Sequence, residues 1–189
     1  MIDDIKTCQN CNLCANQRPL LDNVKKADIM VVGLSAKIIH DATEIPLDTR
    51  TRSGQLVSAL EEIAQGDGLS FYRTNLVKCV PLDDNGKLRY PTKEEINKCF
   101  ENIILEINYI NPKLIILFGS IVENAFENHL QMHFHKSGTK QYKIRQKEKK
   151  YFISMYHPSY VLRSKLRKER FLADYSYLIR FFVQGEWKN

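Results

Sequence analysis

Residues 71–79 read FYRTNLVKC and residues 98–119 read KCFENIILEINYINPKLIILFG, and these two stretches indicate the class of fold. The first opens with aromatic and β-branched residues, which predict a strand over 71–77. The second ends in a short apolar run that predicts a buried strand over 114–118, and Pro112 ends the helix before it. A strand, a helix and a strand in this order are typical of a parallel sheet.

The helix between these strands is predicted over Lys93–Tyr109. Thr92 and Glu95 form the pattern of a capping box, in which each side chain bonds the backbone N–H of the other residue. Cys99 lies on this helix. The apolar residues recur on one face, as expected for a helix that packs on a sheet; they are Ile96, Phe100, Ile103, Ile104 and Ile107.

Further segments extend the alternation of strands and helices. Asp28–Gly33 (DIMVVG) is predicted to be a buried strand that ends in a glycine loop, and Gly54–Ala64 a helix with Ser53 as its N-cap. A helix near Ile121–His129 and a fourth strand at Tyr151–Met155 follow. Four strands with helices between them predict an α/β fold with a parallel sheet.

Length and composition predict one soluble domain. The chain has 189 residues, of which 43% are hydrophobic, and this is enough for an α/β domain with a core of its own. No charged-then-apolar signal segment is present, and the longest apolar run, Leu114–Phe118, is far too short to cross a bilayer. We therefore expect a soluble cytoplasmic protein, a monomer without an obligate protein partner.

The charge balance favours an anionic partner. The formal net charge is +6 and the isoelectric point is near 9.0, which fits nucleic acid, although many basic proteins bind none. Residues 133–150 show an alternation typical of a hairpin, which is either a solvated ribbon or a phosphate-contacting arm. The basic run at 163–170 (RSKLRKER) follows an HPS motif, and this position favours contact with nucleic acid.

Four cysteines form two widely separated pairs. Cys8 and Cys11 lie in TCQNCNLC, Cys79 follows a predicted strand, and Cys99 lies on the next helix. A disulfide framework is disfavoured in a reducing compartment, whereas this spacing is typical of residues that the fold brings around a metal. The pattern predicts one metal cluster, with Cys14 as a spare thiol or an alternative ligand.

The loops that follow the strands are the natural place for chemistry, because ligands bind at the carboxyl ends of the strands in open α/β sheets. These loops cover residues 33–48, 74–81 and 157–163. Each is a weak signal alone, since a single Asn or His is more often structural than catalytic. Their combination and order are therefore more informative than any one of them.

In this order of motifs the chain resembles the iron–sulfur uracil-DNA glycosylases, families four and five of the uracil-DNA glycosylase superfamily. The resemblance runs from Cys8 to Arg163 and includes TNLVKC at 74–79 and YHPSYVLR at 156–163. It implies a three-layer α/β/α sandwich around a four-stranded parallel sheet, a single domain over residues 1–189, and DNA as the partner. It also implies a structural four-iron four-sulfur cluster, whose ligands would be Cys8, Cys11, Cys79 and Cys99.

The base-pocket loop departs from the family-four pattern. That family has GEAPG where this chain has Gly33–Lys37 (GLSAK), and Leu34 instead looks like the family-five loop GLAPA. Family four also stacks a phenylalanine on the base, whereas residues 46–48 (PLD) offer no ring. Base–aromatic stacking is worth about 1–3 kcal/mol, so its loss predicts a roomier or more polar base pocket. Its base-binding residues would be Gly33, Leu34, Leu47 and Asn75.

Excision of a base requires a flipped nucleotide, a stabilised base anion and a well-placed water. We expect His157 to donate a hydrogen bond to the departing base, and Asn75 to read the base edge. Asp41 is the candidate that would position the water or stabilise the cationic sugar, with Glu44 as its substitute.

The resemblance also implies a set of DNA-contacting residues, which are Ser53, Gly54, Pro158, Ser159, Arg163 and Lys165. The first two would hold a phosphate at a helix start, and ordinary N-capping is their alternative role. The next two belong to a segment that would enter the minor groove and fill the gap left by the flipped base. The last two would hold backbone phosphates.

Three functions fit these features. The leading interpretation is a monofunctional DNA glycosylase that releases a modified base and leaves an abasic site, the base being a bulky phage-modified cytosine such as glucosylated hydroxymethylcytosine, in anti-phage defence. The first alternative is a uracil-DNA glycosylase of base-excision repair. The second is a non-catalytic iron–sulfur DNA-binding module, which would need neither His157 nor Asn75 in a pocket.

Overall fold

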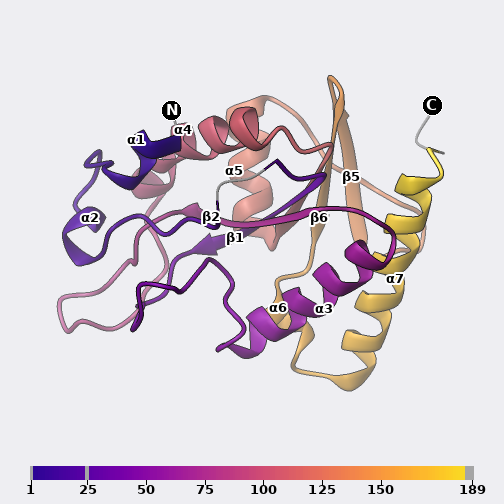
Figure 1. Cartoon of the computed structure of the whole chain (residues 1–189), viewed down its shortest axis with the longest axis horizontal. Coiled ribbons are helices and arrows are strands. Elements are labelled where there is room, and N and C mark those ends of the chain that lie inside the picture. Colours follow the sequence, from indigo (N-terminus) through magenta and orange to yellow (C-terminus); the bar gives the residue numbers. More distant parts are fainter. Residues whose placement is uncertain (1, 24–25, 186–189) are drawn as a thin grey trace.

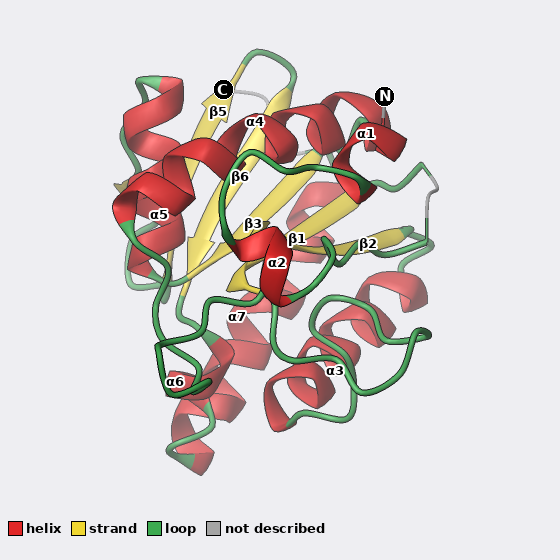
Figure 2. Cartoon of the chain, turned by 90° about the vertical axis from the view of Figure 1, so that its left-hand side faces the viewer, coloured by secondary structure: helices red, strands yellow, loops and turns green. Residues whose placement is uncertain are grey.

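A six-stranded sheet of order β2–β1–β3–β6–β5–β4 forms the centre of the fold (Figures 1 and 2). The computed structural model describes residues 2–23 and 26–185. The strands are β1 (Ile29–Ser35), β2 (Phe71–Val77), β3 (Leu114–Phe118), β4 (His135–Lys136), β5 (Tyr142–Lys147) and β6 (Lys150–Met155). The helices are α1 (Ile2–Lys6), α2 (Leu13–Asn16), α3 (Arg52–Gly66), α4 (Lys93–Ile110), α5 (Ser120–Leu130), α6 (Pro158–Val161) and α7 (Lys165–Val183).

The four strands expected from the sequence are parallel and adjacent. β1 pairs with β2 on one side and with β3 on the other, and β3 pairs with β6, all in parallel. Parallel strands carry their carboxyl ends to the same edge of the sheet. The loops after β1, β2 and β6 therefore meet there, as the sequence predicted.

Helices cover both faces of the sheet, which gives three layers. Because successive side chains in a strand point to opposite faces, Met30 and Tyr72 pack with the residues of α4 and α5, while Ile29 and Phe71 pack with those of α3 and α7. Figure 2 shows the two helix layers on either side of the strands. The prediction of an α/β fold is confirmed.

The prediction of four strands was wrong in number, since the sheet has six. The basic stretch folds into β5, which pairs antiparallel with β6, and the two-residue β4 pairs antiparallel with β5. The hairpin predicted for this stretch is confirmed by these antiparallel pairs. These added strands are largely polar and partly exposed, so they lack the apolar run that identified the four central strands.

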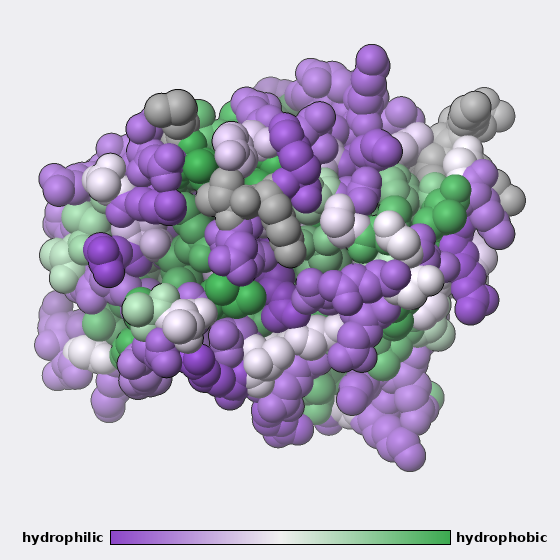
Figure 3. Space-filling model, in the orientation of Figure 1, coloured by the Kyte–Doolittle hydropathy of each residue, from purple (hydrophilic) through white to green (hydrophobic). Residues whose placement is uncertain are grey.

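The surface is mostly polar. Figure 3 shows hydrophilic side chains over much of one face, with smaller apolar areas between them. Among the helices in the described part of the chain, none is both long enough and apolar enough to span a membrane.

The helix starts show one confirmed and one corrected cap. Thr92 and Glu95 form the predicted capping box of α4. Ser53 is not the N-cap of α3; Thr51 is, and its hydroxyl accepts a hydrogen bond from Gly54 N at 3.0 Å. The helix begins two residues earlier than expected, which places Ser53 inside its first turn.

This assignment predicts a contrast between two neighbouring alanine variants. Thr51→Ala should lower the free energy of unfolding by about 1 kcal/mol, because Gly54 N loses its acceptor. Ser53→Ala should change it by less than about 0.5 kcal/mol. Urea unfolding followed by circular dichroism measures both, with Thr51→Ser as the control that retains the hydroxyl. A larger loss in the Ser53 variant would contradict the cap described here.

Candidate active site

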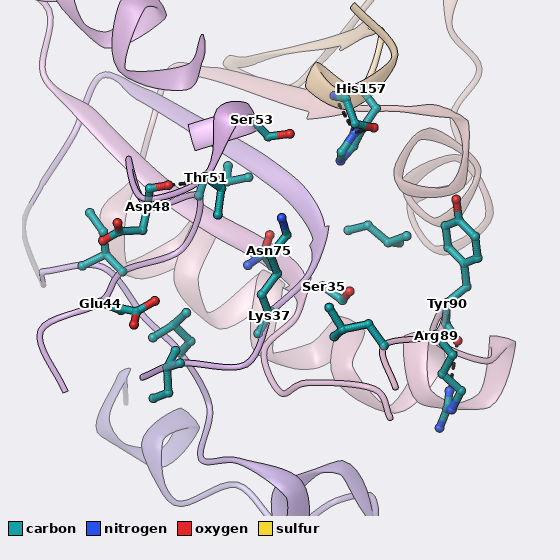
Figure 4. A pocket seen from close by; sticks show the side chains of 18 residues that line it. Ser35, Lys37, Glu44, Asp48, Thr51, Ser53, Asn75, Arg89, Tyr90 and His157 are labelled. Carbon is teal, nitrogen blue, oxygen red and sulfur yellow. Dashed lines mark hydrogen bonds between the residues drawn. The ribbon is translucent and has the colours of Figure 1, made fainter. Parts of the chain in front are cut away.

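A cavity of about 370 Å³ opens at the carboxyl ends of the parallel strands. The loops after β1, β2 and β6 all contribute to its wall (Figure 4). Its volume lies within the range of small-molecule sites, roughly 300–1,000 Å³. The polar and charged residues that line it are Ser35, Lys37, Glu44, Asp48, Thr51, Ser53, Asn75, Arg89, Tyr90, His157 and Ser159.

Asn75 lies near the end of β2, opposite Gly33 of β1 in the sheet. A Cβ on Gly33 would lie only 2.4 Å from Asn75 Oδ1, so the amide occupies space that any other residue at position 33 would take. Asn75 is only 3% exposed, yet its side-chain amide has no hydrogen-bond partner among the described residues. Buried polar groups are normally paired. This amide is therefore available to a ligand in the cavity.

His157 follows β6 and is the N-cap of the short helix α6. Its Nδ1 accepts a hydrogen bond from Ser159 N at 3.2 Å and lies 2.8 Å from Ser159 Oγ. A backbone N–H can only donate, so the neutral ring carries its proton on Nε2. Burial, together with the positive charge of Lys37, lowers the pKa of His157. The ring is thus a neutral Nε2–H donor near physiological pH.

The carboxylates proposed for the loop after β1 differ in position. Glu44 lines the cavity, whereas Asp41 is not among the lining residues. Glu44 Oε1 accepts from His40 N at 2.7 Å and Asp41 N at 3.1 Å, and Arg50 Nη1 lies 2.9 Å away. These backbone bonds and Arg50 lower the pKa of Glu44. Asp41 instead accepts from Thr43 N at 2.8 Å, which with Arg50 lowers its pKa as well.

The same loop is held against the start of α3. Arg73 is buried and donates from Nη1 to Leu47 O at 2.9 Å. Leu47 has a φ of 55°, in the left-handed region that few non-glycine residues adopt. A Cβ on Gly54 would lie 1.8 Å from Asp48 O, so only glycine allows this approach. The fold thereby places Leu47 and Ser53 in the wall of the cavity.

The predicted DNA-contacting residues divide into three groups. Ser53 and Ser159 line the cavity, whereas Arg163, on the turn between α6 and α7, and Lys165, the first residue of α7, are exposed and lie outside it. The remaining two, Gly54 and Pro158, are buried beside the cavity wall. Of the four predicted base-binding residues, Leu34, Leu47 and Asn75 line the cavity, and Gly33 lies behind Asn75.

One part of the wall was missed by the sequence reasoning. Leu88, Arg89 and Tyr90 line the cavity from the loop between β2 and α4, which was read only as a polar connection. Arg89 anchors this loop by donating to Leu82 O at 2.9 Å and to both carboxylate oxygens of Glu95. Tyr90 is 75% exposed at the cavity. An aromatic residue directly before Pro91, which precedes the Thr92 N-cap of α4, was the signal that could have found it.

The five cysteines converge at a second, smaller cavity. Its lining includes Cys8, Cys11, Cys14, Cys79 and Cys99. Asn102 Nδ2 donates to Cys8 Sγ at 3.4 Å and to Cys99 Sγ at 3.7 Å, and Lys78 N donates to Cys99 Sγ at 3.4 Å. N–H donors directed at sulfur suit thiolate ligands.

Burial, reinforced by the neighbouring cysteines, raises the pKa of Cys79 to about 12. Its thiol therefore stays protonated unless a metal displaces the proton. Among the described residues, no group of three or more His, Cys, Asp or Glu side chains is arranged so that it could hold a single metal ion. The donor set fits a thiolate-bound cluster by its chemistry: five cysteines line one cavity, and N–H groups donate to two of the sulfurs, those of Cys8 and Cys99.

The fold and the site together define an α/β protein with a ligand cavity at the carboxyl edge of its parallel sheet, where His, Asn and a carboxylate converge. The sequence model of the uracil DNA glycosylase superfamily matches residues 21–178. The chain therefore belongs to the uracil DNA glycosylase superfamily, and it is a DNA N-glycosylase.

Individual relatives that are 26–28% identical to this chain support the assignment. The chain is 26% identical over 184 residues to the type-4 uracil-DNA glycosylase of Archaeoglobus fulgidus, covering 93% of this chain and 88% of the relative. It is 28% identical over 188 residues to that of Pyrobaculum aerophilum, covering 96% and 91%. The corresponding protein of Thermotoga maritima is 28% identical over 171 residues, with 88% and 83% covered.

The electrostatics of the cavity can be tested through Lys37. Lys37→Gln should raise the pKa of His157 toward its ordinary value, because a positive charge that disfavours the imidazolium is removed. An NMR titration of the His157 ring measures this pKa. Lys113→Gln, at the opposite end of the sheet, is the control and should leave it unchanged. An unchanged His157 pKa in the Lys37 variant would show that burial alone sets it.

Proposed function

We propose that this DNA glycosylase is monofunctional and releases a modified base larger than uracil, leaving an abasic site. A bulky phage-modified cytosine such as glucosylated hydroxymethylcytosine is the proposed substrate, with anti-phage defence as the role. The cavity carries this proposal: beside Asn75 it extends to an apolar and aromatic wall formed by Leu88 and Tyr90. A ring that closes over a small base is absent from residues 46–48.

Base recognition is assigned to Asn75. A base in duplex DNA must leave the stack before it can enter a cavity of this kind. The unpaired amide of Asn75 offers both a donor and an acceptor to the edge of the flipped base. The close approach of Asn75 Oδ1 to Gly33, where a Cβ would be only 2.4 Å away, limits how this amide can turn. Its orientation therefore decides which base edge is accepted.

Stabilisation of the departing base is assigned to His157. The leaving base carries negative charge as the glycosidic bond breaks, and a donor aimed at that charge lowers the barrier. His157 Nε2–H is such a donor, because Ser159 holds Nδ1 in the accepting state. Lys37 lines the same cavity and adds a positive charge. Both residues favour a base that leaves as an anion.

Placement of the attacking water is assigned to Glu44. Its Oε1 is occupied by two backbone N–H groups and Arg50, but Oε2 has no partner in the described part of the chain. A carboxylate oxygen with free lone pairs can accept a hydrogen bond from water. Asp41, the first candidate from the sequence, does not line the cavity.

Uracil excision is the second candidate. The relatives from three organisms are named type-4 uracil-DNA glycosylases, and Asn75 could read the edge of uracil as well as that of cytosine. A non-catalytic DNA-binding module is disfavoured by the convergence of His157, Asn75 and Glu44 on one cavity.

The decisive experiment is release of free base, measured by mass spectrometry, from DNA containing uracil and from DNA containing glucosylated hydroxymethylcytosine. We expect release of the bulky modified cytosine, and His157→Ala should slow it roughly 10²–10³-fold, as expected for loss of one donor to the developing charge. His133→Ala, an exposed histidine outside the cavity, is the control. Release of uracil alone would make this a repair enzyme, and release of neither would favour the binding module.

We further propose that Cys8, Cys11, Cys79 and Cys99 hold a four-iron four-sulfur cluster. When bound, the cluster supplies a structural crosslink, because it would tie the N-terminal segment to the loop after β2 and to α4. The cavity residues His157, Asn75 and Glu44 are not among the residues that surround the cysteines. The chemistry therefore belongs to the protein side chains.

Iron content distinguishes the ligands from the spare thiol. Cys79→Ser should lose most of the bound iron and the visible absorbance of the cluster, and its thermal midpoint should fall. Cys14→Ser is the matched control from the same cavity and should retain iron and absorbance. Equal loss in both variants would show that Cys14 is itself a ligand.

A further inference from the structure

A charged pair lies fully buried beneath the base-reading strand. Lys78 and Glu106 are both 0% exposed, and Lys78 Nζ donates to Glu106 Oε2. The ammonium also donates to Thr74 Oγ1 at 2.7 Å and to the backbone oxygen of Asn75 at 2.7 Å. Its three N–H groups thus have three acceptors.

Glu106, on α4, is equally well paired. It accepts from Tyr72 Oη at 2.9 Å, and Thr74 Oγ1 lies 2.9 and 3.0 Å from its two oxygens. Burial of two charges carries a large desolvation cost, so a buried ion pair adds little stability over an apolar pair of the same shape. A gain in stability alone therefore does not explain this network well. A role in positioning a neighbouring group explains it better.

The network acts on the peptide of Asn75. β2 is the end strand of the sheet, so its outer side has no neighbouring strand. On this strand the carbonyl of Asn75 receives a hydrogen bond from a side chain, Lys78 Nζ. The other end of Lys78 is held as well, since its backbone N donates to Cys99 Sγ. The lysine therefore connects the cysteine site to the residue whose amide faces the cavity.

We propose that Lys78 and Glu106 are a positioning pair that fixes the peptide of Asn75, and with it the angle at which the Asn75 amide meets the flipped base. This inference rests on the proposed role of Asn75 in base recognition. Neither charged group lines the base cavity, so both act through Asn75. A displacement of about 1 Å at a reacting group costs on the order of 10²-fold in rate.

The test uses a variant that removes both charges together. Lys78→Met alone would leave the Glu106 carboxylate buried without its partner, and misfolding would then obscure the result. Lys78→Met/Glu106→Gln leaves no buried charge and keeps an acceptor for Tyr72 and Thr74. The carbonyl of Asn75 loses its donor. Lys6→Met/Asp3→Asn, which removes an exposed ion pair on α1, is the matched control.

Two measurements are made on each variant. The first is the NMR signal of the Asn75 side-chain amide, which requires no catalysis. The second is kcat/KM on DNA containing uracil and on DNA containing glucosylated hydroxymethylcytosine. We expect the double variant to remain folded, to show a shifted or split Asn75 amide signal, and to lose about 10- to 100-fold in kcat/KM on its better substrate, with a changed ratio between the two bases.

A wild-type amide signal and an unchanged ratio of kcat/KM values would overturn the proposal. If the wild-type protein releases neither base, the proposed function fails, and the amide signal still decides whether the pair positions Asn75. If the double variant does not fold, Lys78→Met/Glu106→Met replaces it, because exchange of a buried ion pair for apolar residues of similar volume is often neutral for stability, and it again removes the Lys78 donor to the Asn75 carbonyl. An unperturbed Asn75 amide in that variant would equally overturn the inference.

Discussion

The contact between Gly33 and Asn75 across β1 and β2 is the constraint on which the site depends. The two residues are opposite each other in the parallel pairing, and the Asn75 amide fills the space that a side chain at position 33 would occupy. The pairing of the strands thus directs the amide along the carboxyl edge of the sheet toward the cavity. A shift of one residue in this register would turn Asn75 to the opposite face.

A second close approach shapes the opposite wall of the cavity. The start of α3 contacts the loop after β1 so tightly that position 54 has no room for a Cβ, and Arg73 holds the loop through Leu47 O. Arg73 lies on β2 and is also paired with Glu61 of α3 at 2.5 Å. One buried arginine therefore connects the strand, the loop and the helix that surround the cavity. It holds the backbone of the wall, and not only its side chains.

The charges at the site fit the proposed release of an anionic base. The histidine is held neutral by burial and by Lys37, while Glu44 is held ionised by N–H donors and Arg50. In the proposed mechanism the uncharged donor stabilises the departing base and the carboxylate positions water, so the two tasks fall to separate groups. The environment of each group, more than its residue type, determines its protonation.

The class of fold, the four parallel strands and most of their boundaries follow from the amino-acid sequence alone. Apolar runs between 28 and 155 and the capping box at Thr92 are local signals, so they can be recognised without knowing which distant segments they contact. The motif order also indicated the superfamily and identified His157 and Asn75 as candidate site residues. Both of them line the cavity.

Which polar residues of the loops meet depends on the tertiary structure. It placed Glu44 and not Asp41 at the cavity, gave the α3 cap to Thr51, added Lys37 and Tyr90 to the wall, and brought Lys78 beneath Asn75. These positions depend on loop conformations and on contacts between segments far apart in the chain. Polar loop residues carry no periodic pattern, so their partners are set by where the strands end in space.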